Sequence, residues 1–451
     1  MSFHNLKSFH APTGHLLSKT LNKSRCRFFH SHCRKSIHKC SPLNAHSQRP
    51  SFAPLRQHPF QTSFYFSKRP YHILFFGTDH FALETLKALH KHCIQSGNKN
   101  DSLHVITPPD SSHMRKQVVH PVKRYAIENG LFFVDVPHER RWPKDLKDLR
   151  TFIAQSRKVD VFNEEASGEK APTTRQIRPE EVPSHFDVGV VVSFRYLVPQ
   201  FIVQQFKVGA FNIHPSDLPK YRGPAPLVWT LANGEHSTRI SFIQLFSKFD
   251  HGTVVHQSPP IEIPSNEMYA SLYSRIAKTS AEMSVHFING HSKEELKKLL
   301  QPCESAETLE ATDYIPASEK HPFAPKINQE KHCFVSFHDN TSTEILNKFR
   351  AFSQHWNLHT TVHGKTLYIH KMCPITDTEE LEEIEQKFSS VAAPGEVIFN
   401  KKRKNVYVQC ADGQALTLQE VQYAGRRQTN SEGFAAGLSL RHNQRKLLTE
   451  K

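Results

Sequence analysis

The chain has 451 residues and a formal net charge of +15. Its first 78 residues contain 12 Lys or Arg and no acidic residue, so only about +3 belongs to the rest of the chain. The overall charge therefore does not by itself indicate a nucleic-acid-binding protein. No apolar run reaches the roughly 18 residues of a membrane span, so we expect no membrane insertion.

The segment 1–70 is rich in Arg, Lys, Ser and His and lacks a continuous apolar stretch. These features are typical of a mitochondrial transit peptide and not of a secretory signal. We therefore expect residues 1–70 to be a disordered transit peptide and the mature protein to act in the mitochondrial matrix. A basic RNA-binding arm is the alternative interpretation. Cys26, Cys33 and Cys40 lack the close-pair spacing of a zinc site, so no metal is expected.

From residue 71 onward, predicted strands alternate with predicted helices. Ile73–Phe76 is predicted as a buried strand, and the helix after it carries Leu83, Leu86 and Leu89 at helical spacing. Further strands are predicted at 104–110, 186–194, 210–213 and 240–245, and further helices at 121–130, 199–206, 224–233 and 268–292. This order predicts an α/β fold with an open, mostly parallel, Rossmann-like sheet, in which ligands bind beyond the carboxyl ends of the strands.

The remaining chain divides into an insertion, a linker and a second domain. Residues 138–186 are charged and poor in apolar side chains, so we expect an insertion of loop character within a catalytic domain at 71–303. A linker is expected at 304–330. The last domain, 331–451, has predicted strands at 332–339, 365–372, 395–399, 404–410 and 415–422 and a helix at 341–353. This texture favours a small C-terminal, OB-like β-barrel.

Asn212, His214 and Asp250 form the constellation that suggests chemistry. Taken singly, such residues are usually hydrogen-bonding or turn residues in loops. However, Asn-x-His places two side chains on the same side of a strand, and both lie at a predicted strand end. The trio suits acyl transfer without a covalent enzyme intermediate. The amide and the imidazole would stabilise an oxyanion, and the carboxylate would orient the ring and take up the proton of an attacking amine.

These residues also carry a resemblance to a known family. Asn212–Pro219, followed by Tyr221-Arg222-Gly223, resembles the signature of formyltransferases that use 10-formyltetrahydrofolate, and Phe249–Gly252 resembles their second motif. The similarity covers about 72–300 and, more weakly, 315–440. The segments that resemble methionyl-tRNA formyltransferases in particular are Phe76–Ala82, Pro121–Lys123, Pro394–Ile398 and Leu416–Gly425.

The resemblance implies a role for each matching position. Asn212, His214 and Asp250 would be catalytic, and 10-formyltetrahydrofolate would be the co-substrate. The implied folate-binding residues are Arg195, Leu197, Ser216, Asp217, Leu218 and Pro219. The implied tRNA-binding residues are Arg115, Lys116, Lys401, Lys402, Arg403, Lys404, Arg426 and Arg427, for which solvated surface charge is the alternative. The implied reaction formylates the α-amino group of methionyl-tRNA for mitochondrial translation initiation, and we expect a monomer.

Some features leave two other functions open. Asp217, His251 and Arg195 depart from the pattern usual in methionyl-tRNA formyltransferases, although none of them replaces a catalytic group. From Glu319 to the end, 18 basic residues stand against 15 acidic ones, so the net charge gives only limited support for RNA binding. One alternative is a formyltransferase that acts on a small-molecule amine. The other is a catalytically impaired mitochondrial RNA-binding protein.

Overall fold

The computed structural model describes residues 71–96, 101–113, 116–136, 142, 149–155, 159–164, 170–175, 182–301, 321–388, 393–441 and 445–448. All of the described residues belong to one compact unit. The segment 1–70, expected to be a transit peptide, therefore lies outside the described residues. Within the described residues, no helix combines the length and the apolar character needed to cross a membrane.

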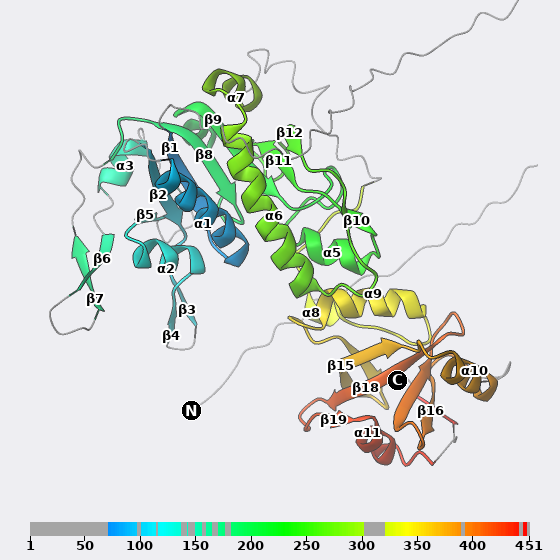
Figure 1. The fold of residues 1–451 in the computed structure, drawn as a ribbon. Helices are drawn as coiled ribbons and strands as arrows, with labels where there is room; N and C mark the ends of the chain where they lie inside the picture. Colours follow the sequence, from blue (N-terminus) through cyan, green and yellow to red (C-terminus); the bar gives the residue numbers. More distant parts are fainter. Residues whose placement is uncertain are drawn as a thin grey trace, which may run out of the picture. The chain divides into compact units, whose positions relative to one another are not determined.

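The first half of the described chain is built on a seven-stranded sheet with the order β12-β11-β9-β8-β1-β2-β5 (Figure 1). Its strands are β1 (His72–Gly77), β2 (Ser102–Thr107), β5 (Phe132–Asp135), β8 (Phe186–Val192), β9 (Phe206–His214), β11 (Ser241–Gln244) and β12 (Val254–Gln257). Every pairing from β5 to β9 is parallel, whereas β11 and β12 are antiparallel additions at one edge. The strand order reverses between β1 and β8, and ligands bind at such a switch point, beyond the carboxyl ends.

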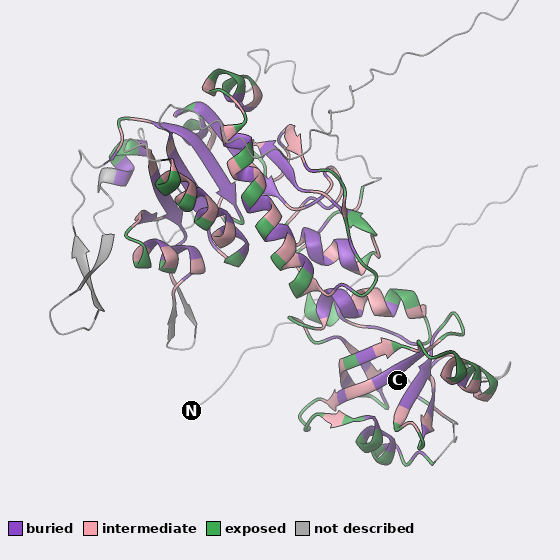
Figure 2. Cartoon of the chain, in the orientation of Figure 1, coloured by how far each residue is buried: buried purple, intermediate pink, exposed green. Residues whose placement is uncertain are grey.

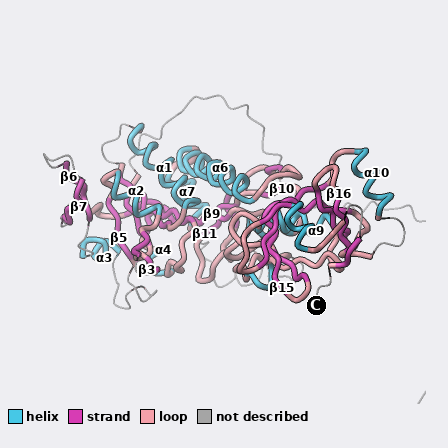
Figure 3. Tube along the Cα trace, turned by 90° about the horizontal axis from the view of Figure 1, so that it is seen from below, coloured by secondary structure: helices cyan, strands magenta, loops and turns pink. Residues whose placement is uncertain are grey.

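Alternating side chains of the sheet face two helical layers. On β1, Ile73 and Phe75 belong to the core on one face of the sheet, whereas Leu74 and Phe76 belong to the core on the opposite face. Helices α1 (His80–Gln95) and α6 (Tyr269–Asn289) lie on one side, and α3 (Leu149–Gln155) and α4 (Gln200–Val203) lie on the other (Figure 3). Both faces are thus covered, which explains why most residues of the parallel strands β1, β2, β8 and β9 are buried (Figure 2).

The remaining elements of this half are short. They are β3 (Ser111–His113), β4 (Lys116–Val118), α2 (Pro121–Glu128), β6 (Val159–Glu164), β7 (Lys170–Arg175), α5 (Pro226–Ala232), β10 (Ser237–Thr238), β13 (Ile261–Glu262) and α7 (Lys293–Leu300). β3 pairs with β4, β6 pairs with β7 and β10 pairs with β13, each antiparallel.

The expectation of loop character at 138–186 was wrong over α3 and over the hairpin of β6 and β7. In α3, Leu149, Phe152 and Ile153 are buried in the core on the second face of the sheet. Their spacing of three and four residues gives this short helix an apolar stripe. A charged composition with few apolar residues hid that stripe.

The C-terminal part is one antiparallel sheet with the order β14-β15-β18-β17-β16-β20, and β19 pairs with β18. Its strands are β14 (His359–Val362), β15 (Lys365–Pro374), β16 (Glu396–Asn400), β17 (Asn405–Gln409), β18 (Ala415–Tyr423), β19 (Thr429–Asn430) and β20 (Arg445–Leu447). Its helices are α8 (Gln329–His332), α9 (Ser342–Phe352), α10 (Thr378–Lys387) and α11 (Ser431–Gly437). The predicted fold class, an open Rossmann-like sheet followed by a small barrel domain, is confirmed.

The strand predicted at 332–339 was wrong. Cys333, Val335 and Phe337 are buried, but so is Ser336, and the segment forms only a single bridge, from Phe334 to His359. The chain turns away at Ser336, whose backbone N–H donates to the Asn340 side chain at 3.1 Å. That turn leads directly into α9, so no ladder can form.

A continuous apolar core joins the two sheets through α5 and α9. Trp229 of α5 packs edge-on against Phe352 of α9, with 6.1 Å between the ring centroids. Its indole N–H donates to the carbonyl oxygen of Pro325 at 2.8 Å. Arg350 of α9 donates to the carbonyl oxygen of Pro264 at 3.2 Å. The contact between the two parts of the chain therefore combines a buried apolar seam with directed hydrogen bonds.

Candidate active site

Asn212 and His214 extend from the same side of β9 and meet Asp250 at the carboxyl end of the strand. The Asn212 amide nitrogen donates to Asp250 Oδ1 at 3.3 Å. His214 Nδ1 lies 3.5 Å from the same oxygen. His214 is buried, with 4 % of its surface exposed, whereas the Asp250 side chain is 14 % exposed. The three predicted catalytic side chains therefore form one cluster that opens to solvent at the carboxylate.

Backbone groups from the loop at 221–223 complete this cluster. His214 Nε2 lies 2.9 Å from the carbonyl oxygen of Tyr221. A carbonyl oxygen only accepts, so Nε2 carries a hydrogen in this arrangement and Nδ1 faces the carboxylate. The backbone N–H of Gly223 donates to Asp250 Oδ2 at 3.2 Å. Each carboxylate oxygen therefore has a partner, and the imidazole ring is fixed from both sides.

The loop that carries Asp250 is held in a demanding conformation. Asp250 has φ +55, in the left-handed region that non-glycine residues seldom adopt, at a cost of about 1–3 kcal/mol. Two residues later, a Cβ on Gly252 would lie 1.8 Å from the carbonyl oxygen of Gln244 in β11. The missing side chain thus lets the loop approach β11, where the Gln244 N–H donates to the Thr253 carbonyl at 2.9 Å. Close packing on β11 positions the carboxylate.

A segment from the predicted linker braces the same site. The Tyr221 N–H donates to the Pro322 carbonyl at 2.7 Å, and the Ala324 N–H donates to the Arg222 carbonyl at 2.7 Å. These bonds form a parallel bridge between Arg222 and Phe323. His214 and Asp250 contact backbone groups of the loop at 221–223. That loop is in turn held by a segment about 100 residues later in the sequence.

The predicted folate-binding residues of the loop after β9 differ in their surroundings. Ser216 is fully buried, and its hydroxyl donates to the Lys220 carbonyl at 2.8 Å. Asp217 lies 3.4 Å from Arg239 Nε and accepts from the Gln257 amide at 3.3 Å. Leu218 is buried, and Pro219 follows it through a cis peptide bond. Ser216 and Leu218 thus shape the loop from inside, and Asp217 forms polar contacts to neighbouring elements.

The other two predicted folate-binding residues follow the carboxyl end of β8. Arg195 is exposed, and Leu197 is 37 % exposed. The carbonyl of Leu197 accepts the indole N–H of Trp142 at 2.9 Å. Both residues lie beyond a strand that borders the switch point, where a ligand is expected in such a sheet. The hydrogen bond from Trp142 helps to fix the backbone at Leu197.

Asp79 is a residue at this sheet end that sequence reasoning did not assign to the site. It follows β1 directly and caps α1, because its carboxylate accepts the Ala82 N–H at 3.1 Å. Burial raises the pKa of this carboxyl, against the effect of hydrogen bonds from Ala82 and Ser193 and of the nearby Arg195 charge. The signal in the sequence was its place immediately after the first strand and its turn, where cap residues are common.

The raised pKa of Asp79 predicts a pH effect on stability. The folded state binds the proton more tightly than the unfolded state, so stability falls as the pH rises from about 4 through the raised pKa. Asp79→Asn keeps a cap acceptor and removes the titration. Its thermal midpoint relative to wild type should therefore rise across this interval, as measured by scanning calorimetry between pH 4 and 8. A difference that does not change with pH would contradict the assignment.

The predicted tRNA-binding cations fall into different environments. Arg115 lies outside the described residues, as does the side chain of Lys116. In the turn between β18 and β19, Arg426 and Arg427 are exposed and form no ion pair with any described residue. Lys402 is likewise exposed and unpaired among the described residues. Lys401 is exposed, and Lys404 lies 3.6 Å from Glu432 in a surface pair of little energetic weight.

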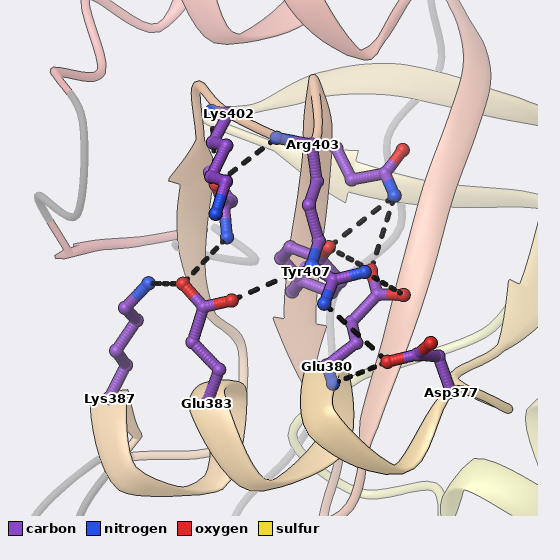
Figure 4. Close-up of polar contacts among 9 residues, drawn as sticks. Asp377, Glu380, Glu383, Lys387, Lys402, Arg403 and Tyr407 are labelled. Atoms are coloured by element: carbon purple, nitrogen blue, oxygen red, sulfur yellow. Dashed lines mark hydrogen bonds and ion pairs between the residues drawn. The ribbon is translucent and has the colours of Figure 1, made fainter.

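Arg403 stands apart from its neighbours because α10 surrounds it with carboxylates (Figure 4). Its guanidinium lies 3.4 Å from Asp377, 3.5 Å from Glu380 and 3.5 Å from Glu383. Glu380 also accepts the hydroxyl hydrogen of buried Tyr407. The acidic helix therefore binds back onto the strand pair β16–β17 by way of Arg403.

Comparison with known proteins bears on the whole described region. The chain matches the Formyl transferase family model over residues 71–288 and the model of the Formyl transferase C-terminal domain over residues 326–439. A mitochondrial methionyl-tRNA formyltransferase from Homo sapiens is 28 % identical, with 77 % of this chain and 73 % of that protein covered. A methionyl-tRNA formyltransferase from Geobacter metallireducens is also 28 % identical, with 82 % of this chain and 96 % of that protein covered.

Among solved structures, an N-formyltransferase from Helicobacter canadensis in complex with folinic acid and dTDP-3-aminofucose is 17 % identical. The alignment has a TM-score of 0.44 and covers 77 % of this chain and 99 % of that one. The two family models together span both sheets of the described structure, and the first contains Asn212, His214 and Asp250. The chain therefore belongs to the formyl transferase family, with both its catalytic and its C-terminal domain.

Proposed function

We propose that this protein transfers the formyl group of 10-formyltetrahydrofolate to the α-amino group of methionyl-tRNA in the mitochondrial matrix, for translation initiation. The observation that carries the proposal is the hydrogen-bonded cluster of Asn212, His214 and Asp250 at the end of β9. The similarity to methionyl-tRNA formyltransferases along both domains supports the choice of acceptor. Two observations support a mitochondrial location: relatives such as the one from Homo sapiens are mitochondrial enzymes, and the segment 1–70 is basic and contains no acidic residue.

We propose a task for each group in formyl transfer. The acceptor amine attacks the formyl carbon, and a tetrahedral intermediate with a negatively charged oxygen forms. Asn212 Nδ2 carries two hydrogens, of which one is directed at Asp250, so the second can be donated to that oxygen. The Asp250 carboxylate accepts the proton that the amine loses, directly or through water. The intermediate then collapses with departure of the tetrahydrofolate nitrogen, which leaves the formyl group on the acceptor.

His214 has a positioning role in this arrangement. The His214 ring lies between the Tyr221 carbonyl and Asp250. It therefore orients the Asp250 carboxylate and keeps the negative charge of that carboxylate close to the reacting atoms. Protonation at Nδ1 would place a positive charge beside Asp250 as the amine loses its proton. We propose that His214 supports the oxyanion through this charge.

The donor set of the site fits a formyl-bearing folate as substrate. The reacting group is a neutral carbonyl that becomes anionic, and the site offers an amide donor and an imidazole beside a single carboxylate. We propose that Ser216, Asp217, Leu218 and Pro219 border the folate, with backbone groups near Arg195 and Leu197 contacting its pterin. The described residues contain no group of three or more His, Cys, Asp or Glu arranged to hold a metal ion.

One assay tests the proposed acceptor. Protein beginning at residue 71 would be incubated with a radiolabelled formyl donor and, in separate reactions, with methionyl-tRNA or small amines such as an amino sugar nucleotide. Label on methionyl-tRNA is the expected result. Label found only on a small amine would show that the acceptor is a small molecule and not methionyl-tRNA. RNA binding without turnover would indicate an impaired enzyme. Sedimentation of the same sample tests the expected monomer.

The exposed basic residues of the C-terminal domain give a prediction about salt dependence. We propose that Arg426 and Arg427, with Lys401, Lys402 and Lys404, contact tRNA phosphates. The double variant Arg426→Gln/Arg427→Gln should then weaken tRNA binding and reduce the slope of log affinity against log salt by about 1–2. Filter binding at several salt concentrations measures the slope.

Arg403→Gln is the matched comparison for this experiment. Because three carboxylates already neutralise Arg403, we expect this variant to retain the wild-type slope and to lower the thermal midpoint instead. A smaller slope for Arg403→Gln than for the double variant would contradict the division of roles between these arginines.

A further inference from the structure

Three of the most exposed large apolar side chains of the described structure lie in two segments next to the proposed site: the loop that carries Asp250, and the segment bridged to Arg222, whose neighbour Gly223 donates to Asp250. Phe246 and Phe249 lie in the loop that carries the carboxylate and are 48 % and 54 % exposed. Phe323 comes from the segment that leads into the C-terminal domain and is 60 % exposed. An exposed aromatic side chain beside an active site favours a ligand with a flat apolar face.

Phe323 is the best anchored of these rings. The ring edge packs on Gly223, since a Cβ there would lie 2.9 Å from its Cζ atom. Its backbone is fixed on both sides, because Pro322 accepts the Tyr221 N–H and Ala324 donates to Arg222, each at 2.7 Å. One residue further, Pro325 accepts the Trp229 indole N–H at 2.8 Å. The ring is therefore presented to solvent by a rigid backbone and loses little conformational freedom when it binds.

The short separation between Phe323 and Asp250 restricts which part of a ligand can contact the ring. Gly223, under the ring, donates its N–H to Asp250 Oδ2 at 3.2 Å, so only one residue separates the ring from the carboxylate that receives the amine proton. In an aminoacyl-tRNA, that amine belongs to an amino acid esterified to the ribose of the terminal adenosine. A terminal adenine base is consequently a short distance from the attacking nitrogen, and it has a flat face.

We propose that Phe323 is a stacking platform for the terminal adenine base of the acceptor tRNA. The inference rests on the proposed function and adds a residue that selects a nucleotide-linked amine over a free one. Stacking of a base on an aromatic side chain is independent of base pairing, which suits an unpaired 3′ end. Phe323 lies in the segment that leads into the C-terminal domain, and that domain carries the exposed Arg426 and Arg427.

A double-mutant cycle between protein and RNA tests the proposal without catalysis. The probes are an uncharged RNA minihelix that ends in CCA and the same minihelix without its terminal adenosine. Removal of the adenosine should weaken wild-type binding by about 5- to 100-fold, the range expected for loss of one stacked base. Phe323→Ala should bind both RNAs with nearly equal affinity, whereas Phe323→Trp should keep the wild-type preference. An adenosine effect of the same size in Phe323→Ala and wild type would overturn the proposal.

Steady-state kinetics separates the adenine from the pterin of the formyl donor as the stacked group. Phe323→Ala should raise KM for methionyl-tRNA about 5- to 100-fold and leave KM for the formyl donor unchanged, since the ring contacts only the acceptor. A rise confined to the donor KM would overturn the proposal. Ile94→Ala removes another exposed apolar side chain, 66 % exposed near the far end of α1, and should behave as wild type in both assays.

The two levels of inference fail in different ways. If the wild-type protein formylates only small amines, the proposed function is wrong, and the binding cycle still reports whether Phe323 recognises adenine. If wild type formylates methionyl-tRNA and Phe323→Ala loses nothing, only the platform is wrong. Thermal midpoints of all variants should match wild type, because the replaced side chain is mostly exposed and its backbone bridge to Arg222 is retained.

Discussion

Replacement of Asp250 by Asn is expected to lower kcat/KM for formyl transfer by about 10²- to 10⁴-fold, the range for loss of a general base. The amide can still accept the Gly223 N–H, so the loop keeps its shape, but the group that receives the amine proton is gone. Transfer of labelled formyl groups under single-turnover conditions measures the chemical step. A variant with wild-type rate would remove Asp250 from the mechanism.

Asn212→Ala serves as the companion variant, because it deletes the donor and leaves the carboxylate. We expect a loss of about 10²- to 10³-fold in kcat, typical of a missing oxyanion donor. The two losses should not add in the double variant, since both side chains act on one intermediate and share a hydrogen bond. Full additivity would indicate that the two groups serve separate steps.

Gly252→Ala is expected to reduce activity about 100-fold although the residue carries no functional group. A Cβ there would lie 1.8 Å from the Gln244 carbonyl oxygen, so the loop must move away from β11 and take Asp250 with it. Displacement of a catalytic group by about 1 Å costs rate on this scale. The forced shift should also destabilise the fold by about 1–3 kcal/mol, which urea unfolding measures.

Gly437→Ala is the control for this experiment. Gly437 ends α11 and is exposed, and a Cβ added there would contact nothing beyond its chain neighbours and its own helix. We expect wild-type activity and unchanged or slightly increased stability from it. Equal losses in the two variants would mean that the backbone at position 252 is not constrained by β11.

Two of the proposed catalytic side chains could be brought together from the sequence because their pattern is local. Asn212 and His214 are two residues apart on a strand, and that spacing alone brings them to one side. Asp250 follows the next strand, β11, which pairs with β9 in the sheet. The hydrophobic runs that predicted these strands also predicted the parallel sheet and the strand end that carries Asn212 and His214. Because β11 runs antiparallel to β9, the approach of Asp250 to that end depends on how its loop folds back, which the strand pattern does not show.

Backbone partners of the site could not be predicted in the same way. The Tyr221 carbonyl and the Gly223 N–H are groups that every non-proline residue has, so no residue type marks them. Their contribution depends on how the loop folds over the trio. Arg403 illustrates the same limit for charge, since a run of four basic residues did not reveal that α10 would bring three carboxylates to one of them.

The bridge between Arg222 and Phe323 means that the unit performing the chemistry is not contiguous in the sequence. A chain that stops after the last helix of the parallel sheet contains all three proposed catalytic side chains but lacks the backbone that supports the loop at 221–223. The natural point for exchanging C-terminal domains between relatives therefore lies beyond Pro325, whose carbonyl is bound by Trp229. A C-terminal domain exchanged upstream of that point would bring with it the segment that supports the loop at 221–223, and not only its own surface.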